Sequence, residues 1–305
     1  MWAITAYFNP AGYRRRLSNY RIFRANLAAP LVTVELSFDG RFELTDDDAD
    51  ILIQLSGGAV LWQKERLLNI AIQSVPQSAK SIAWLDCDVI FGRPDWMQEA
   101  EQKLSENNIV QLFSDVVDLG PGGYPASVQH DDIRPTGHGI VSAINNGGLE
   151  KLDAAVESGK NSRQPFPTGM AWAARRKILE GRGFYDALIV GGGDRATVHA
   201  IYGQFEVPLL QLNKPRHDHY LRWARAYHEV VAGKIDNVPG RIFHLWHGNF
   251  LNRNSRGRQR LLAGFDYHPD LDLRIGPNGA WHWARPRPDL EAFLRTYFIS
   301  RAEDE

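Results

Sequence analysis

The sequence has almost no cysteine and almost no net charge. Cys87 is the one cysteine in 305 residues, which excludes an intramolecular disulfide and a zinc site built from cysteines alone. We therefore expect a reducing, cytoplasmic location and no disulfide-linked partner. Because 35 lysines and arginines nearly balance 36 aspartates and glutamates, the formal net charge is −1. No strong overall field draws such a chain to nucleic acid or to a membrane, so any basic surface must be local.

Long apolar runs are missing as well. No stretch of about 18 apolar residues, the length that a membrane-spanning helix needs, occurs in the chain. Residues 1–4 lack the basic segment and the longer apolar segment of a signal peptide. We therefore expect neither a membrane span nor secretion. The hydrophobic share of 44% and the charged share of 23% are typical of a globular protein that buries a large core.

Strand and helix signals alternate along the first third of the chain. Strand patterns cover residues 2–7, 31–36 and 51–55, and helix patterns cover residues 14–27, 61–75 and 96–104. Strands separated by helices predict an α/β fold with a parallel sheet. In open sheets of this kind, ligands bind beyond the carboxyl ends of the strands.

Two aspartates directly follow the next apolar strand, at residues 82–85. The local sequence is SIAWLDCDVIFGRPD (81–95), and in an extended chain Asp86 and Asp88 point to the same side. Mg²⁺ and Mn²⁺ prefer oxygen ligands and often bind one or two carboxylates together with substrate phosphates. The pair therefore indicates a metal site of the kind that holds a nucleotide-sugar. A simple turn, in which aspartate is also favoured, is the alternative.

The composition changes between residues 120 and 167. This stretch is rich in glycine and polar residues and shows little periodicity, which predicts either a long functional loop or lid or a poorly ordered segment. A strand at 170–177, a tight turn at 191–194 and a helix at 195–202 follow. We expect a single domain with a nucleotide-binding half (about 1–115), a loop or lid region (about 116–165) and an acceptor-side half with the C-terminal region (about 166–305).

Several segments, taken in order, resemble the GT-A fold glycosyltransferases. They are FNPAGYRRRLSNYRIFR (8–24), LWQKERLLN (61–69), WLDCDVIF (84–91), the glycine-rich stretch at 167–203 and HLWHG (244–248). Within that superfamily they look most like a little-characterised bacterial and viral group. The resemblance covers the chain nearly end to end. It implies a Rossmann-like, mostly parallel sheet flanked by helices with an acceptor-side subregion, a nucleotide-sugar donor, and Mn²⁺ or Mg²⁺.

The same resemblance implies roles at the metal and the acceptor. Asp86 and Asp88 would bind the metal together with a histidine, with His247 the first choice and His244 the second, although both histidines could instead be packing residues. Asp194 would bind the acceptor hydroxyl and, as in inverting members, remove its proton. The family more often has glutamate before this aspartate, where the present chain has glycine. A helix cap is the alternative role for Asp194.

The N-terminal third resembles the nucleotide-binding half of the fold. Tyr7, Phe8 and Asn9 end the first strand, and Glu35 lies at the end of the second. An aromatic ring can stack on uracil, and a carboxylate can accept hydrogen bonds from the base or the ribose. We expect these four residues to contact the donor, with a place in the core as the alternative for Phe8.

Four further residues are expected at the donor. Lys64 and Asn69 lie on the helix predicted before the aspartate pair, and Asp86 follows that helix. Arg253 can bind a diphosphate because a guanidinium group binds phosphate oxygens in a fork. A surface lysine paired with Glu65 is the alternative for Lys64.

The sequence thus predicts a metal-dependent glycosyltransferase that moves a sugar from a nucleotide-sugar, first of all a UDP-sugar, to an acceptor hydroxyl. The acceptor would be a glycan or, as a second choice, a hydroxymethylated base of DNA bound through local arginine clusters. Two alternatives are a nucleotidyltransferase and a catalytically silent protein that binds a nucleotide or a sugar.

Overall fold

The computed structural model describes residues 1–123, 135–152, 166–206, 213–254 and 257–305. Its centre is a seven-stranded sheet with the order β10-β6-β9-β4-β1-β2-β3. The strands are β1 (Trp2–Phe8), β2 (Leu31–Ser37), β3 (Ile51–Ser56), β4 (Ser81–Leu85), β6 (Ile109–Gln111), β9 (Ala171–Arg175) and β10 (Ile235–Asn237). In this sheet β9 alone runs antiparallel to its neighbours, β4 and β6, and the other pairs are parallel. The sheet is therefore mostly parallel, as the sequence predicted.

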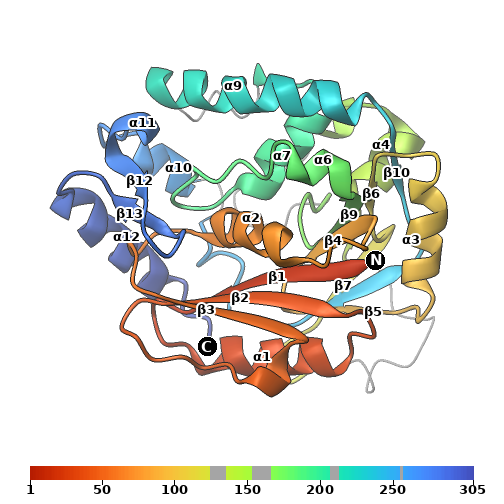
Figure 1. The fold of residues 1–305 in the computed structure, drawn as a ribbon, viewed down its shortest axis with the longest axis horizontal. Coiled ribbons are helices and arrows are strands. Elements are labelled where there is room, and N and C mark those ends of the chain that lie inside the picture. The colour runs from red at the N-terminus through yellow and green to blue at the C-terminus, as the bar shows by residue number, and fades with distance from the viewer. Residues whose placement is uncertain (124–134, 153–165, 207–212, 255–256) are drawn as a thin grey trace.

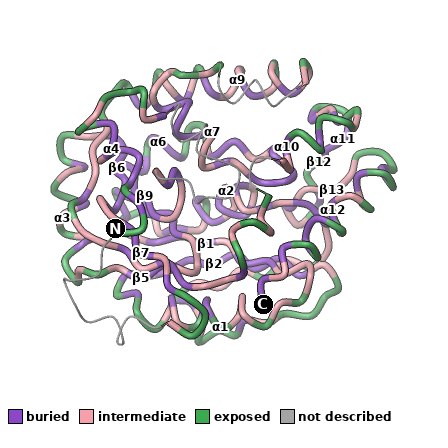
Figure 2. Tube along the Cα trace, turned by 180° about the vertical axis from the view of Figure 1, so that it is seen from behind, coloured by how far each residue is buried: buried purple, intermediate pink, exposed green. Residues whose placement is uncertain are grey.

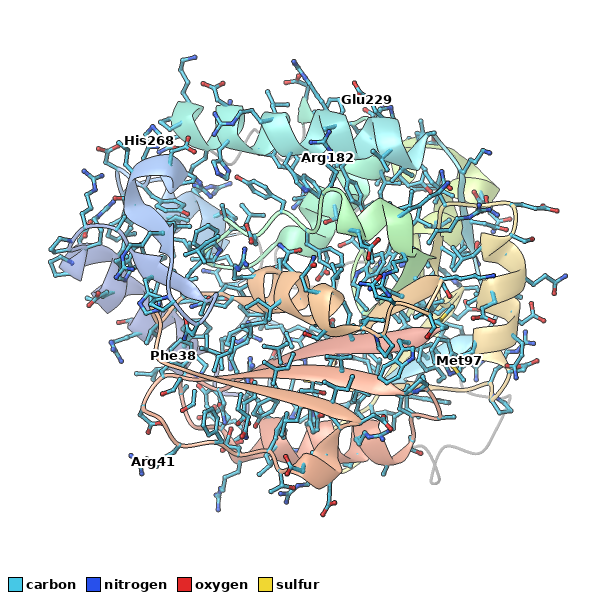
Figure 3. All side chains as sticks on the ribbon, viewed as in Figure 1. Phe38, Arg41, Met97, Arg182, Glu229 and His268 are labelled. Carbon is cyan, nitrogen blue, oxygen red and sulfur yellow. The ribbon has the colours of Figure 1, made fainter. Side chains whose placement is uncertain are left out.

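Helices cover both faces of this sheet (Figure 1). Strand residues alternate between the faces, so that Ile4 of β1 packs with one core cluster and Ala3 with the other. The first face is covered by α2 (Lys64–Ser74), α6 (Arg176–Glu180), α7 (Gly193–Ile201) and α9 (Lys214–Val231), and the second by α1 (Arg14–Ala25) and α3 (Trp96–Leu104). The central strands are mostly buried, whereas exposed residues gather on the outer helices and loops (Figure 2). Side chains fill the space between the sheet and α2 (Figure 3).

A second sheet lies beyond the aspartate pair. It has the order β5-β11-β7-β8, and its strands are β5 (Val89–Phe91), β7 (Asp115–Asp118), β8 (Gly137–His138) and β11 (Arg241–His244). Strand β11 runs antiparallel to β5 and parallel to β7. This sheet brings the C-terminal half of the chain to the segment that follows β4.

The remaining elements lie outside these two sheets. They are the 3-10 helix η1 (Asp46–Asp48), helices α4 (Ile140–Gly147), α10 (Gly257–Leu262), α11 (Pro269–Asp272) and α12 (Pro288–Ser300), and the two-stranded sheet of β12 (Leu273–Ile275) and β13 (Trp281–Trp283). Among the described residues, no helix is long and apolar enough to cross a bilayer.

The element boundaries agree with the sequence patterns in most places, and two differences are informative. Helix α4 lies within the stretch 120–167 that showed little periodicity; it buries Ile140, Val141 and Ile144 on one side despite its asparagines. Residues 124–134 and 153–165 of that stretch lie outside the described residues. The strand predicted at 170–177 is β9 (Ala171–Arg175), which ends earlier because Arg175 is the N-cap of α6 and the helix begins at Arg176.

Candidate functional site

The register of the second sheet brings histidine to the aspartate pair. Val89, directly after Asp88, pairs with His244 across β5 and β11. The backbone NH of Leu245 then donates to the Asp88 carbonyl at 2.8 Å. These bonds hold the HLWHG segment against the end of β4, so that sequence positions far apart share one small volume.

Asp88, His244 and His247 form a cluster that fits a divalent cation. Their ligand atoms all lie within 4.8 Å of one another, and Oδ2 of Asp88 is 3.1 Å from Nε2 of His247. The Oδ1 atom of Asp88 is buried and has no hydrogen-bond partner within the described chain. One carboxylate oxygen and two imidazole nitrogens are a donor set that Mn²⁺ accepts. The residues present therefore fit the metal that the sequence predicted.

Hydrogen bonds fix which nitrogen of His244 faces this cluster. Nδ1 of His244 lies 2.9 Å from Oδ1 of Asp118, and since a carboxylate only accepts, Nδ1 carries a proton and Nε2 faces the cluster. Arg253 donates to Nε2 of His247 at 2.7 Å. Burial and the nearby charge of Arg253 hold the pKa of His247 well below its usual range, so its imidazole is neutral. The two Nε2 atoms are 3.2 Å apart, so both would reach one cation if Arg253 gave up its bond to His247.

The other aspartate of the pair faces a different partner. Oδ1 of Asp86 is 2.5 Å from Nζ of Lys64, at the first residue of α2. The same Nζ lies 3.0 Å from both carboxylate oxygens of Asp194. Burial opposes the charged form of Lys64, but Asp194 and Asp86 outweigh it and raise the pKa of the ammonium well above its usual value. Lys64 therefore stays charged and joins the two carboxylates.

A glycine turn places Asp194 beside Lys64. Gly191 and Gly192 have φ values of +81° and +105°, which are left-handed conformations that favour glycine, and Gly192 is the N-cap of α7. Asp194 is thus not the cap of the helix but lies in its first turn. In the first turn the helix dipole favours a negative charge. Gly169 leaves room for the Asp194 carboxylate, since a Cβ atom at Gly169 would lie 2.6 Å from Oδ2 of Asp194.

Arginines gather on the far side of the histidines. Arg253 is half-buried, lies 4.3 Å over the ring of Phe250 and leaves its Nε atom without a partner in the described chain. Burial and Arg301 lower the pKa of Arg253 to about 10, which leaves it charged at neutral pH. Arg16 binds both oxygens of Glu303, at 2.6 and 3.0 Å, and Arg301 binds Glu303 as well. Among the described residues, Glu303 is thus the one carboxylate paired with Arg16 and Arg301.

Sequence reasoning did not identify Asp118, Arg16, Arg301 or Glu303 at this site. Arg16 lies in the FNPAGYRRRLSNYRIFR motif. Its position in the first turn of the helix after β1, three residues after the N-cap Tyr13, was the available signal that it could lie at the site. Asp118, Arg301 and Glu303 stand in no recognisable motif, so only the fold reveals them.

The residues expected at the nucleotide have protein partners here. Tyr7 and Asn9 both donate to the carboxylate of Glu43, and Glu35, buried in β2, accepts from the backbone NH of Glu43 at 2.6 Å. They hold the segment after β2 at the edge of the sheet. A contact with a nucleotide base or ribose stays a prediction for all three.

Phe8 and Asn69 also have defined structural contacts. Phe8 is buried in the core against Trp62 and Phe298, which agrees with the alternative stated for it. Asn69 bonds to both the NH and the carbonyl of Phe184 and to Asp186, and so holds the segment before the glycine turn. The structure brings together Asp86, Lys64 and Asp194 on one side and Asp88, His244, His247 and Arg253 on the other.

The chain has the mostly parallel sheet flanked by helices that its sequence predicted, with Asp86 and Asp88 after the carboxyl end of β4. No protein-family model matches the chain, and no curated protein matches it either.

Several solved structures are similar in fold. Glucosyl-3-phosphoglycerate synthase from Mycobacterium tuberculosis, in complex with Mn²⁺, UDP and phosphoglyceric acid, is 14% identical over 95% of this chain and 90% of that one, with a TM-score of 0.41. Residues 1–349 of S. aureus TarS are 11% identical over 99% of this chain and 71% of that one, also with a TM-score of 0.41. The 4-diphosphocytidyl-2C-methyl-D-erythritol synthase from Anaerococcus prevotii is 10% identical over 78% and 87%, with a TM-score of 0.35. Identities and TM-scores this low carry no conclusion about the function of this chain.

Proposed function

We propose that this protein is a metal-dependent GT-A glycosyltransferase that transfers a sugar from a nucleotide-sugar, first of all a UDP-sugar, to an acceptor hydroxyl. One observation carries the proposal: the candidate metal cluster of Asp88, His244 and His247 lies next to the charged chain of Asp86, Lys64 and Asp194. The candidate cation site and the proposed base would therefore adjoin each other at the carboxyl edge of the sheet, where ligands bind in such folds.

The metal would be Mn²⁺ or Mg²⁺, bound by Asp88 with His247 and His244. When bound, it would neutralise charge on the departing nucleotide diphosphate. Binding would replace the hydrogen bond from Arg253 to His247, and the released guanidinium would be free to bind a phosphate oxygen. A role for Asp86 as a second metal ligand remains a prediction, since its carboxylate pairs with Lys64.

Asp194 would act on the acceptor. The anomeric C–O bond to the diphosphate breaks, the acceptor oxygen forms the new bond, and the acceptor proton passes to the Asp194 carboxylate. Lys64 supports this role because its Nζ, 3.0 Å from both carboxylate oxygens of Asp194, holds that carboxylate in place. A glycan acceptor agrees best with the near-zero net charge, and a hydroxymethylated DNA base is the second choice.

The nucleotidyltransferase alternative receives less support. Such an enzyme uses free backbone NH groups in a loop after its first strand to hold phosphates. Here the NH groups of Arg14 and Arg15 donate to the carboxylate of Asp304. A catalytically silent binding protein is the other alternative, and the cytoplasmic location stays a prediction.

The test is a thermal-shift screen of UDP, UDP-glucose, UDP-N-acetylglucosamine and the four ribonucleoside triphosphates, each with Mn²⁺ and with a chelator. A ligand that binds only the native state raises its apparent stability. We expect a rise in Tm with UDP and one UDP-sugar that the chelator abolishes, followed by release of UDP when an acceptor is supplied. A response to a triphosphate with release of pyrophosphate would favour the nucleotidyltransferase. No response in folded protein would contradict the proposal.

A further inference from the structure

Glu65 is buried beside Asp194 without a partner for one of its oxygens. Its exposed fraction is 4%, and its Oε1 atom has no hydrogen bond within the described residues. The neighbouring ammonium of Lys64 lies within bonding distance of Asp86 and Asp194 instead. An unsatisfied carboxyl oxygen in the interior costs free energy, so its position calls for a ligand that the protein itself does not supply.

The unsatisfied carboxyl lies at a small cavity that Asp194 shares. The cavity has a volume of about 10 Å³, which is space for about one water molecule or one hydroxyl group. Its polar walls come from two carboxylates and two threonines, and its other walls are largely aromatic. The lining includes Glu65, Asp194, Thr168, Thr197, Trp84 and Phe184.

The glycine turn of α7 makes this placement sterically feasible. A Cβ atom at Gly193 would lie 2.1 Å from Oε1 of Glu65, so a larger residue there would push the carboxyl away. Helices α2 and α7 lie on the same face of the sheet (Figure 1), and the first turns of both supply the groups around the cavity. Because Gly193 has no side chain, the Glu65 carboxyl can lie against the start of α7, the helix that carries Asp194.

We propose that Glu65 is the second carboxyl group of the acceptor site and that it holds the attacking hydroxyl, of an acceptor or of water, against Asp194. This inference rests on the proposed function, which it deepens. The hydroxyl donates its hydrogen bond to Asp194, which receives the proton during transfer. Glu65, in its protonated form, donates to the hydroxyl oxygen and neither gains nor loses a proton in the reaction.

The charge state of Glu65 agrees with this role. Burial raises its pKa to about 8, Lys64 opposes the rise, and Asp194 and Asp186 add to it. These three are the charged groups that act on it from α2, from α7 and from the segment before the glycine turn. At pH 7 Glu65 is therefore mostly protonated and able to donate. Above pH 8 it ionises, and two carboxylates would then face the same hydroxyl.

The first test compares the parent chain with Glu65→Gln, Glu65→Ala and the control Glu106→Gln, whose side chain is exposed. Binding of UDP with Mn²⁺ is measured by calorimetry, and hydrolysis of UDP-glucose and UDP-N-acetylglucosamine, with water as the acceptor, is measured from pH 6 to 9. We expect UDP affinity to change less than about twofold in all variants. Glu65→Ala should lose about tenfold or more in kcat.

The Glu65→Gln variant separates positioning from simple packing. An amide still donates a hydrogen bond but cannot ionise, so this variant should retain activity at pH 7 and lack the decline that the parent shows near pH 8. If the parent, Glu65→Gln and Glu65→Ala share one pH profile and one kcat, Glu65 only packs and the inference is wrong.

A second measurement does not depend on transferase activity. A crystal structure of the parent chain at high resolution should show one ordered solvent oxygen within hydrogen-bond distance of both Glu65 and Asp194. A dry cavity, or a Glu65 side chain turned away from it, would overturn the inference. If the parent binds and hydrolyses no UDP-sugar, the proposed function fails, while the crystal structure still decides whether the two carboxyl groups share a hydroxyl site.

Discussion

Oδ2 of Asp88 lies 3.1 Å from Nε2 of His247, although the two residues are separated by more than half of the chain. The antiparallel pairing of β5 with β11 produces this contact, because it fixes the segment after β11 against the end of β4. The predicted metal site therefore depends on a strand pairing as much as on the aspartate motif.

Removal of the Asp88 carboxylate should abolish metal-dependent binding. Asp88→Ala deletes the one carboxylate of the candidate cluster, so the Tm increase that UDP produces with Mn²⁺ should disappear, while the far-UV circular dichroism spectrum stays that of the parent. Asp47→Asn, an exposed aspartate of η1, serves as the control and should behave as the parent does. Undiminished Mn²⁺ enhancement of UDP binding by Asp88→Ala would contradict the metal assignment.

Substitution of Asp194 should lower kcat and leave the affinity for the donor nucleotide unchanged. Asp194→Asn removes the proposed base, and general base catalysis contributes about 10²- to 10⁴-fold, so transfer or donor hydrolysis should decrease by that order. UDP binding with Mn²⁺, measured by calorimetry, should stay within about twofold of the parent. Equal kcat values for the two proteins would exclude a base at this position.

The raised pKa of Glu65 predicts how stability depends on pH. Because the folded-state pKa is about 8, against the ordinary 4.5, the unfolded chain releases this proton first as pH rises. The stabilisation is fully present below about pH 4.5 and is lost as the pH rises through about 8. We would measure the free energy of unfolding in urea for the parent and for Glu65→Gln over this pH window. The parent should lose stability relative to Glu65→Gln as the pH rises. Glu106→Gln should follow the parent at every pH.

Glu303 has the opposite dependence. Burial would raise its pKa, but Arg16 and Arg301 outweigh burial and lower it to about 2, from the ordinary 4.5. The stabilisation is therefore present above about pH 4.5 and is lost as pH falls through about 2. Glu303→Gln should lower the free energy of unfolding at pH 7 by about 3 kcal/mol, since it takes the carboxylate away from the buried Arg301 and the half-buried Arg16.

The control variant for Glu303→Gln is Glu305→Gln, because Glu305 is exposed and lies two residues away. Urea titrations at pH 7, 4.5 and 3 should show the deficit of Glu303→Gln shrinking at the lowest pH, whereas Glu305→Gln stays close to the parent throughout. A deficit of the same size at all three values would mean that the Arg16–Glu303 pair contributes nothing through its charge.

Local sequence patterns predicted much of the architecture. The helix expected at 96–104 is α3 (Trp96–Leu104), and the first three strands lie within one residue or so of their expected bounds. These elements depend on the spacing of apolar residues along a short stretch, which the sequence displays directly. The antiparallel direction of β9 was not predicted, because strand direction depends on the path of the whole chain.

The amino-acid sequence by itself determined the alternating strands and helices, the acidic end of β4 and the glycine turn before Asp194, since each is a property of neighbouring residues. Only the tertiary structure decided that Asp88 faces the histidines while Asp86 faces Lys64. It likewise decided that Glu65 shares a cavity with Asp194 and that Glu303 joins Arg16 to Arg301. Such contacts depend on strand register and on packing between segments far apart in the chain, and no local spacing of residues encodes them.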